Sequence, residues 1–208
     1  MKVVLYGASG TIGSRILHEL VSRGHQVTAV VRHPEKVAAP GVAVLQGDVL
    51  DAQSVAGTAR GADAAISSYA PPADDTQKLV EATRTLLQGL ADAGVRRFIM
   101  VGGAGSLEIA PGLQLLDAPN FPEMWKPYAI AHRDALAVLY AADIGWTNCS
   151  PAALIEPGQR TGMFRLGKDT LVTNEKGESR ISAEDYAAAL VDELEEPQFM
   201  RQRFTVGY

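Results

Sequence analysis

Three glycines at regular spacing follow a short apolar run at the start of the chain. In the segment GASGTIG they are Gly7, Gly10 and Gly13. In a dinucleotide site the first permits a tight turn, the second lets backbone approach a pyrophosphate, and the third lets a helix pack closely on the strand. The alternative is a purely structural turn. The residues predicted to bind the dinucleotide here are Gly7, Ala8, Ser9, Gly10, Thr11, Ile12 and Gly13.

The residues after the next two apolar runs bear on which dinucleotide is bound. In AVVRHPEK, Arg32 stands where NAD sites usually carry Asp or Glu, and arginine suits the 2′-phosphate of NADP. We therefore predict that NADP(H) is preferred over NAD(H), the alternative being a solvated surface arginine. In LQGDVLD, Asp48, with Val49 beside it, could accept a hydrogen bond from the adenine amino group or could serve as a turn or cap residue.

These residues need a scaffold that brings the ends of several strands together. Apolar runs rich in β-formers alternate with amphipathic patterns, which is typical of right-handed βαβ crossovers in a doubly wound parallel sheet. This predicts a Rossmann-like α/β fold with ligands beyond the carboxyl ends of the strands. We expect one domain over residues 1–208, with residues from about 152 contributing a small C-terminal cap on the substrate side. The predicted strands are 2–7, 25–32, 42–48, 63–69, 96–103, 146–155 and 202–208, and the predicted helices are 11–24, 51–61, 76–94, 128–143 and 182–196.

Composition excludes several classes of function. The net charge is −5 and no block of Lys or Arg occurs, so neither nucleic acid nor an anionic membrane is an expected partner. No run of 18 apolar residues occurs, and we expect a soluble cytoplasmic protein, either a monomer or a homodimer. The four histidines are scattered, so no metal site is predicted. Cys149, the one cysteine, lies in a strand-like context that favours a buried, unreactive thiol over a nucleophile.

The segments GASGTIG, VVRHPEK, QGDVLD and SPAALIEPG together resemble the atypical short-chain dehydrogenase/reductase group. Within it, the chain is similar to the small NADH-flavin reductases, to biliverdin reductase B and to NmrA-like redox regulators. The resemblance covers essentially the whole chain and implies a nucleotide site that continues toward the ribose and the nicotinamide. The further residues it assigns to that site are Ser67, Ser68, Tyr69, Gly102, Pro151 and Ala152.

The catalytic residues of short-chain dehydrogenases are only partly matched. The group uses a Ser and a Tyr-x-x-x-Lys pair, whereas YAIAH has Tyr128 followed by His132. The serine position at the end of the fifth predicted strand is glycine in VGGAGSLE, and Ser106 could replace it only if the loop curls back. Tyr128, His132 and Ser106 are the candidate catalytic residues. For His132, a helix histidine satisfied locally is the alternative.

This loss bears on the reaction. Ketone reduction needs a proton donor placed against an alkoxide, whereas a flavin or quinone spreads the incoming charge over a conjugated system. We therefore expect hydride transfer from NADPH to a planar acceptor such as FMN, another flavin or a quinone. The alternative is a non-catalytic, NmrA-like sensor of NADP(H), and a sugar-nucleotide epimerase is a weaker third. The apolar residues that could form the acceptor slot, or simply pack the cap, are Phe121, Met124, Trp125, Tyr128, Met163 and Phe164.

Overall fold

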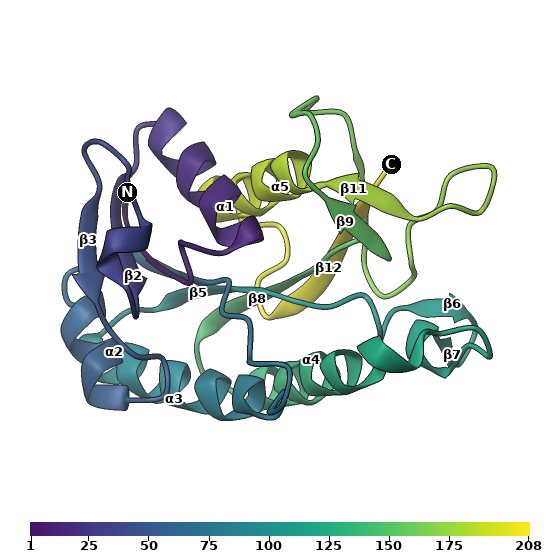
Figure 1. The fold of residues 1–208 in the computed structure, drawn as a ribbon, viewed down its shortest axis with the longest axis horizontal. Helices are drawn as coiled ribbons and strands as arrows, with labels where there is room; N and C mark the ends of the chain where they lie inside the picture. Colours follow the sequence, from purple (N-terminus) through teal and green to yellow (C-terminus); the bar gives the residue numbers. More distant parts are fainter.

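A single eight-stranded sheet forms the centre of the molecule. The computed structural model describes residues 1–208, and its strand order is β10-β12-β8-β5-β4-β1-β2-β3 (Figure 1). All neighbouring strands are parallel except β10, which is antiparallel to β12. The predicted Rossmann-like fold is thus confirmed. The strands are β1 Lys2–Tyr6, β2 Gln26–Val31, β3 Ala43–Gln46, β4 Ala64–Ser67, β5 Arg97–Val101, β8 Gly145–Ser150, β10 Arg165–Gly167 and β12 Gln202–Gly207.

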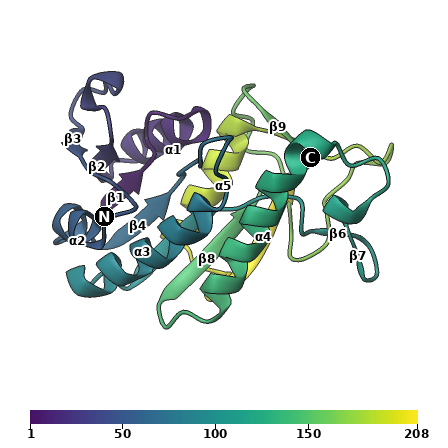
Figure 2. The ribbon, with the colours of Figure 1, turned by 60° about the horizontal axis from the view of Figure 1, so that its bottom comes forward.

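Five helices cover the two faces of this sheet. An apolar core lies between the helices and the sheet on each face. Helices α1 (Thr11–Ser22) and α5 (Ala183–Glu195) lie above the sheet in Figure 1. Helices α2 (Ala52–Ala59), α3 (Lys78–Ala93) and α4 (Lys126–Tyr140) lie below it and come forward in Figure 2. Alternate residues of each strand supply the two cores, as strand geometry requires. None of the helices combines the length and the apolar character that a membrane span would need.

The chain beyond residue 152 divides between the sheet and a small outer layer. Strands β10 and β12 extend the central sheet, and α5 packs on α1. Strands β9 (Leu154–Glu156) and β11 (Arg180–Ser182) instead form a separate parallel pair. The predicted strand 146–155 is therefore two strands, because Pro151 between them has no N–H to donate to a ladder. At the same end of the molecule, at the lower right in Figure 1, a hairpin of β6 (Glu108–Ala110) and β7 (Leu113–Gln114) precedes α4.

A buried carboxylate on α5 binds residues 161 and 162 in the loop that follows β9. Asp185 is fully buried, and its Oδ1 accepts hydrogen bonds from the N–H groups of Thr161 and Gly162 at 2.8 Å each. Its Oδ2 accepts from the hydroxyls of Thr161 at 2.6 Å and Tyr208 at 2.8 Å. Burial by itself raises the pKa of Asp185, but these hydrogen bonds outweigh burial and lower that pKa below its ordinary value. The ionised carboxylate therefore stabilises the loop.

We expect Asp185→Asn to lower the free energy of unfolding by about 2–4 kcal/mol, because the amide puts a donor opposite donors. A lowered folded-state pKa stabilises the protein above the unfolded-state value near 4 and ceases to do so as the pH falls through the folded-state pKa. The difference in free energy of unfolding between wild type and Asp185→Asn should thus become smaller as the pH falls. Urea denaturation from pH 7 down to pH 3 measures it. Asp192→Asn, which removes an exposed partner of Arg23 on the same helix, is the control and should change little. Equal stability of Asp185→Asn and wild type would contradict this account.

Candidate cofactor and active site

The turn after β1 is built by close backbone packing among three residues. Gly7 has a positive φ of 81°, and a Cβ on it would lie 2.7 Å from the carbonyl oxygen of Ser68. A Cβ on Gly13 would lie 2.1 Å from the oxygen of Gly7 and 2.5 Å from Ser68 Oγ. The Ser68 hydroxyl donates to the carbonyl oxygens of Tyr6 and Gly7, each 3.1 Å away. The first and third glycines are therefore required by the fold itself, and α1 starts directly against β1 and β4.

This packing leaves the amino end of α1 without partners from the protein. The N–H groups of Thr11, Ile12 and Gly13 make no hydrogen bond within the chain. The helix has no side-chain N-cap and no acidic residue in its first turn. A Cβ on Gly10 would meet only the oxygen of Gly7, at 3.4 Å, so the space over Gly10 is open. Free amides, a positive helix dipole and an open approach together suit a phosphate or diphosphate group.

Not all residues of the predicted glycine segment face this opening. The Ala8 side chain is 1% exposed within the core under α1, and Ile12 packs against the same core. Both can reach a phosphate only through backbone amides. Ser9 and Thr11 are exposed, so their hydroxyls are free to face a ligand.

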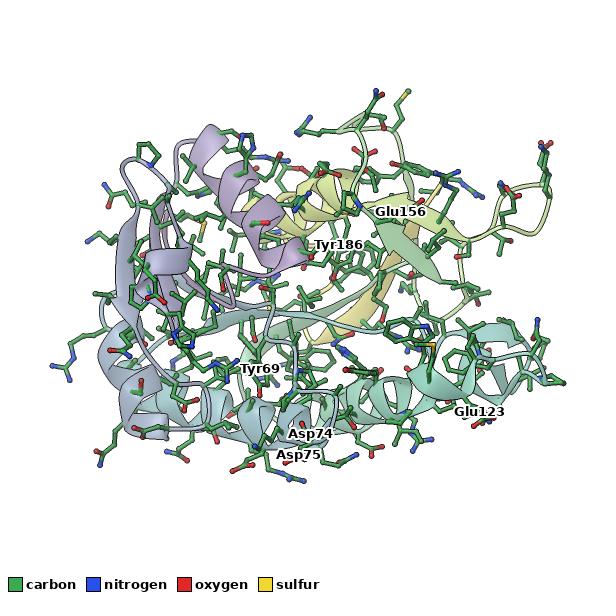
Figure 3. All side chains as sticks on the ribbon, in the orientation of Figure 1. Tyr69, Asp74, Asp75, Glu123, Glu156 and Tyr186 are labelled. Atoms are coloured by element: carbon green, nitrogen blue, oxygen red, sulfur yellow. The ribbon has the colours of Figure 1, made fainter.

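A pocket of about 240 Å³ extends from this turn over the ends of β1, β2 and β4. It joins eight residues that the sequence assigns to the nucleotide. These are Gly7, Ser9, Gly10, Arg32, Asp48, Val49, Ser68 and Tyr69. Tyr69 lies near the middle of the molecule, below α1 in Figure 3. Burial raises the pKa of Tyr69, and the positive charge of the nearby Arg32 partly offsets that rise. The two side chains therefore interact electrostatically in this pocket.

Asp48 has a structural part as well as a free acceptor. Its Oδ1 accepts a hydrogen bond from the N–H of Leu50 at 2.9 Å, and its own N–H donates to Ser54 Oγ at 2.9 Å. The turn role is thus present, while Asp48 Oδ2 accepts no hydrogen bond from the chain and lies on an exposed residue. Binding of adenine by Asp48 stays a prediction. Ser67 is buried, with Oγ 3.4 Å from the N–H of Tyr69, so it supports the loop rather than lining the pocket.

Sequence reasoning missed other walls of this pocket, notably Gly47 and Leu50. A Cβ on Gly47 would lie 2.6 Å from Val30 Cγ1. The glycine in QGD was the available signal, because a glycine at a strand end often marks a close approach of two chains.

The end of β5 explains why glycine occupies the expected serine position. A Cβ on Gly103 would lie 2.8 Å from His132 Cβ and 2.9 Å from its Cγ. A Cβ on Gly102 would lie 2.3 Å from Asn148 Oδ1. Side chains from α4 and β8 therefore fill the space that a serine would need. Asn148 is a residue that the sequence analysis did not single out.

His132 is an uncharged residue in this environment. Burial lowers the pKa of His132 to about 4, so its imidazole is neutral at pH 7. It makes no hydrogen bond within the chain, so the alternative of a locally satisfied histidine is not what the structure shows. Tyr128 lies one turn earlier on α4, half-buried, with its ring 5.7 Å from that of Trp125. The positive charge that Lys supplies in Tyr-x-x-x-Lys is therefore absent from this helix face.

Ser106 is held away as part of a different network. The loop after β5 does curl back, since the N–H of Leu107 donates to the oxygen of Ala104. The Ser106 side chain is 7% exposed, however, and its Oγ accepts a hydrogen bond from Arg203 of β12 at 2.8 Å. Arg203 also pairs with Asp169 at 2.6 Å. The observed role of Ser106 is thus to fix this loop to the edge of the sheet.

The remaining predicted residues lie around the same end of the sheet. Pro151 and Ala152 are buried directly after β8, and their place beside a nicotinamide stays a prediction. Among the predicted slot residues, Met124 is 72% and Met163 76% exposed, whereas Phe164 packs against the core around α5. In Figure 3, Glu123 marks the segment just before α4, below the sheet, and Glu156 marks the end of β9, above it. Cys149 faces the α5 core, where burial raises its pKa, as expected of an unreactive thiol.

The comparison with known proteins agrees with this geometry. A family model described as NAD(P)H-binding matches residues 7–197. The chain belongs to this NAD(P)H-binding family. The uncharacterized protein YwnB of Bacillus subtilis strain 168 is 42% identical over 210 residues, which span 99% of this chain and 98% of YwnB.

Two solved structures resemble this NAD(P)H-binding protein closely over its full length. One, from Streptococcus pneumoniae TIGR4, is provisionally named an NADH-flavin reductase. It has a TM-score of 0.90 and 36% identity, covering 100% of this chain and 99% of its own. The other, from Bacteroides thetaiotaomicron, is provisionally named an epimerase. It has a TM-score of 0.93 and 47% identity, and the match covers 100% of this chain and 96% of its own. The resemblance to atypical short-chain dehydrogenases/reductases is thus confirmed at the level of the family.

We expect Gly13→Ala to destabilise this NAD(P)H-binding protein by about 3 kcal/mol or more and to abolish nucleotide binding, because the methyl group would overlap backbone. Gly57→Ala is the matched control, since a Cβ there meets nothing within 4 Å in helix α2. It should raise stability by about 0.5–1 kcal/mol and leave binding unchanged. Thermal melts with and without NADPH report both quantities. A Gly13→Ala protein that melts and binds like wild type would refute the packing described for this turn.

Proposed function

We propose that the protein is an NADPH-dependent reductase that transfers hydride to a planar conjugated acceptor such as a flavin or a quinone. The observation that carries the proposal is the unpartnered amino end of α1, which opens beside the pocket that Arg32 and Asp48 line. The match to the NAD(P)H-binding family supports the nucleotide, and the likeness to a provisionally named NADH-flavin reductase supports the acceptor class.

The residues fit a dinucleotide in a definite order along the sheet. The amides of Thr11, Ile12 and Gly13 would bind the pyrophosphate, and Asp48 Oδ2 the adenine amino group. Arg32 is exposed at the pocket and pairs with no carboxylate, so its guanidinium is free to bind a 2′-phosphate. This supports NADP(H) over NAD(H).

The catalytic end favours an acceptor that needs little acid–base help. When bound, the reduced nicotinamide supplies the hydride. A neutral His132 offers no charge to stabilise a tyrosinate at Tyr128, and Ser106 is engaged by Arg203. The chain would supply position instead: the rings of Trp125 and Tyr128, 5.7 Å apart and tilted by 53°, offer aromatic surface for a flat acceptor. Tyr128 and His132 are the side chains we propose to border the acceptor and the nicotinamide ribose.

A second candidate is a non-catalytic sensor of the NADP(H) redox state. The observation that favours it is the same neutral His132 beside Gly103, because neither supplies the usual catalytic groups. An epimerase is supported less well, even though one close structural relative carries that provisional name. Epimerases of this superfamily keep the full Tyr-x-x-x-Lys pair, which this chain lacks.

Arg32→Ala tests the choice of cofactor. Loss of the charged partner of a 2′-phosphate should weaken NADPH binding roughly 10- to 100-fold and leave NADH binding almost unchanged. Isothermal titration calorimetry measures both affinities. The control is Arg60→Ala, which removes the same charge from an exposed site at the end of α2, outside the nucleotide pocket. A similar loss for both nucleotides would show that Arg32 does not bind the 2′-phosphate.

Turnover separates the reductase from the sensor. We expect NADPH oxidation, followed at 340 nm, to rise severalfold above background with riboflavin, FMN or menadione. Tight binding of NADPH without turnover of any planar acceptor would favour the sensor, especially if NADP⁺ bound with a different affinity. Absence of heat or thermal shift with both NADPH and NADH would remove both candidates.

A further inference from the structure

Two buried polar atoms without a partner belong to His132 of α4 and Asn148 of β8. In the whole molecule only three buried side-chain nitrogen or oxygen atoms lack a hydrogen bond, and two of these are His132 Nδ1 and Asn148 Nδ2. The third is the Nε of Arg97, whose other two nitrogens are well bonded. An unpaired buried donor costs about 1–3 kcal/mol, and asparagine is disfavoured inside strands. Asn148, 2% exposed within β8, therefore requires a reason other than stability.

The two side chains meet the same short segment of backbone. The Cβ position of Gly102 lies 3.1 Å from Asn148 Nδ2, and that of Gly103 lies 3.1 Å from His132 Cδ2. Asn148 pairs in register with Met100, whose side chain belongs to the core beneath α4. Asn148 and His132 thus contact consecutive glycines in the space between the end of β5 and α4. Neither glycine could carry a side chain without displacing one of them.

The hydrogen-bonding groups in this space are complementary. Ser150 Oγ donates to Asn148 Oδ1 at 3.4 Å, which leaves Nδ2 as the free donor of the amide. A neutral imidazole has one donor and one acceptor, so Nδ1 can accept from Asn148 only when Nε2 carries the proton. His132 Nε2 has no partner in the chain and is not among the buried unpaired atoms, so it stays accessible on the opposite side of the ring.

We propose that Asn148 is a positioning residue whose Nδ2–H donates to His132 Nδ1 through one buried water, and that this link fixes His132 as the Nε2–H tautomer. The accessible Nε2 of His132 then offers a hydrogen-bond donor, rather than a lone pair, to a bound ligand. The assignment of that donor to catalysis rests on the proposed function, in which His132 borders the ribose and the acceptor. A donor at this point suits a ribose oxygen, or an acceptor oxygen on which negative charge grows during reduction.

The tautomer can be measured without cofactor or substrate. Long-range ¹H–¹⁵N correlation spectra of the nucleotide-free protein at pH 7 distinguish the two neutral forms, and loss of one signal in His132→Gln assigns it among the four histidines. We expect the Nε2–H form in wild type, a mixture in Asn148→Leu, and the Nδ1–H form in Asn148→Asp, where a carboxylate faces Nδ1. A wild-type Nδ1–H form, or one tautomer shared by wild type and Asn148→Leu, would overturn the proposal.

Asn148→Leu also separates positioning from structure. Leucine has a similar size and carries no polar atom, but it removes the partners of His132 Nδ1 and Ser150 Oγ. The melting temperature should therefore fall only slightly, which keeps this variant informative if Asn148→Asp does not fold. Its kcat/KM should fall about tenfold, and the same substitution in a His132→Phe background should have no further effect. An equal additional loss in that background would show that Asn148 does not act through His132. Absence of all turnover would refute the reductase and leave the tautomer result standing.

Discussion

The molecule depends on one crowded contact, where the turn after β1 meets the end of β4. The backbone of Gly7, the hydroxyl of Ser68 and the Cα of Gly13 occupy a volume that admits no additional methyl group. The N-cap residue of α1 is Gly10, which has no side chain with which to cap the first turn. The free amides therefore lie directly beside the crowded contact, so one short segment both completes the core under α1 and leaves donors open to a ligand. Stability and nucleotide affinity are coupled at this point, since neither can be changed without moving the backbone.

The region between the end of β5 and α4 is built differently, because polar side chains replace part of the apolar core there. The polar side chains in this region are those of Asn148, His132 and Ser150. On the same face of the sheet, Met100 and Phe98 of β5 belong to the apolar core. Two of the polar atoms have no partner within the chain, and burying polar atoms in this way is costly. Natural proteins accept such costs chiefly at functional sites. The two consecutive glycines at the end of β5 belong to this arrangement, since they make room for the amide and the imidazole.

The sequence predicts the parts of the structure that follow from local pattern. Strand and helix periods predict every strand of the central sheet except β10, and the spacing of the glycines locates the tight turn between β1 and α1. Ser182 caps α5 as its position before Glu184 and Asp185 indicates. Contacts between distant segments are not encoded in any local pattern, so Asn148 and the Arg203–Ser106 bond could not be foreseen. Likewise nothing near Asp185 shows that it would bind residues 161 and 162, because that contact exists only after α5 packs against the outer layer.

The difference in rigidity between the two ends of the crevice bears on acceptor choice. At the proposed nucleotide end, the groups available for binding are backbone amides in fixed positions, so little conformational entropy would be lost on binding. At the acceptor end the candidate walls are Trp125 and two methionines that are more than 70% exposed. Methionine is flexible and polarisable and can adapt to surfaces of different outline. A flat ring system held against Trp125 and Tyr128 gains most of its binding from area, which many conjugated molecules share. On the proposed function, the fold would combine a strict requirement for the hydride donor with a permissive one for the acceptor.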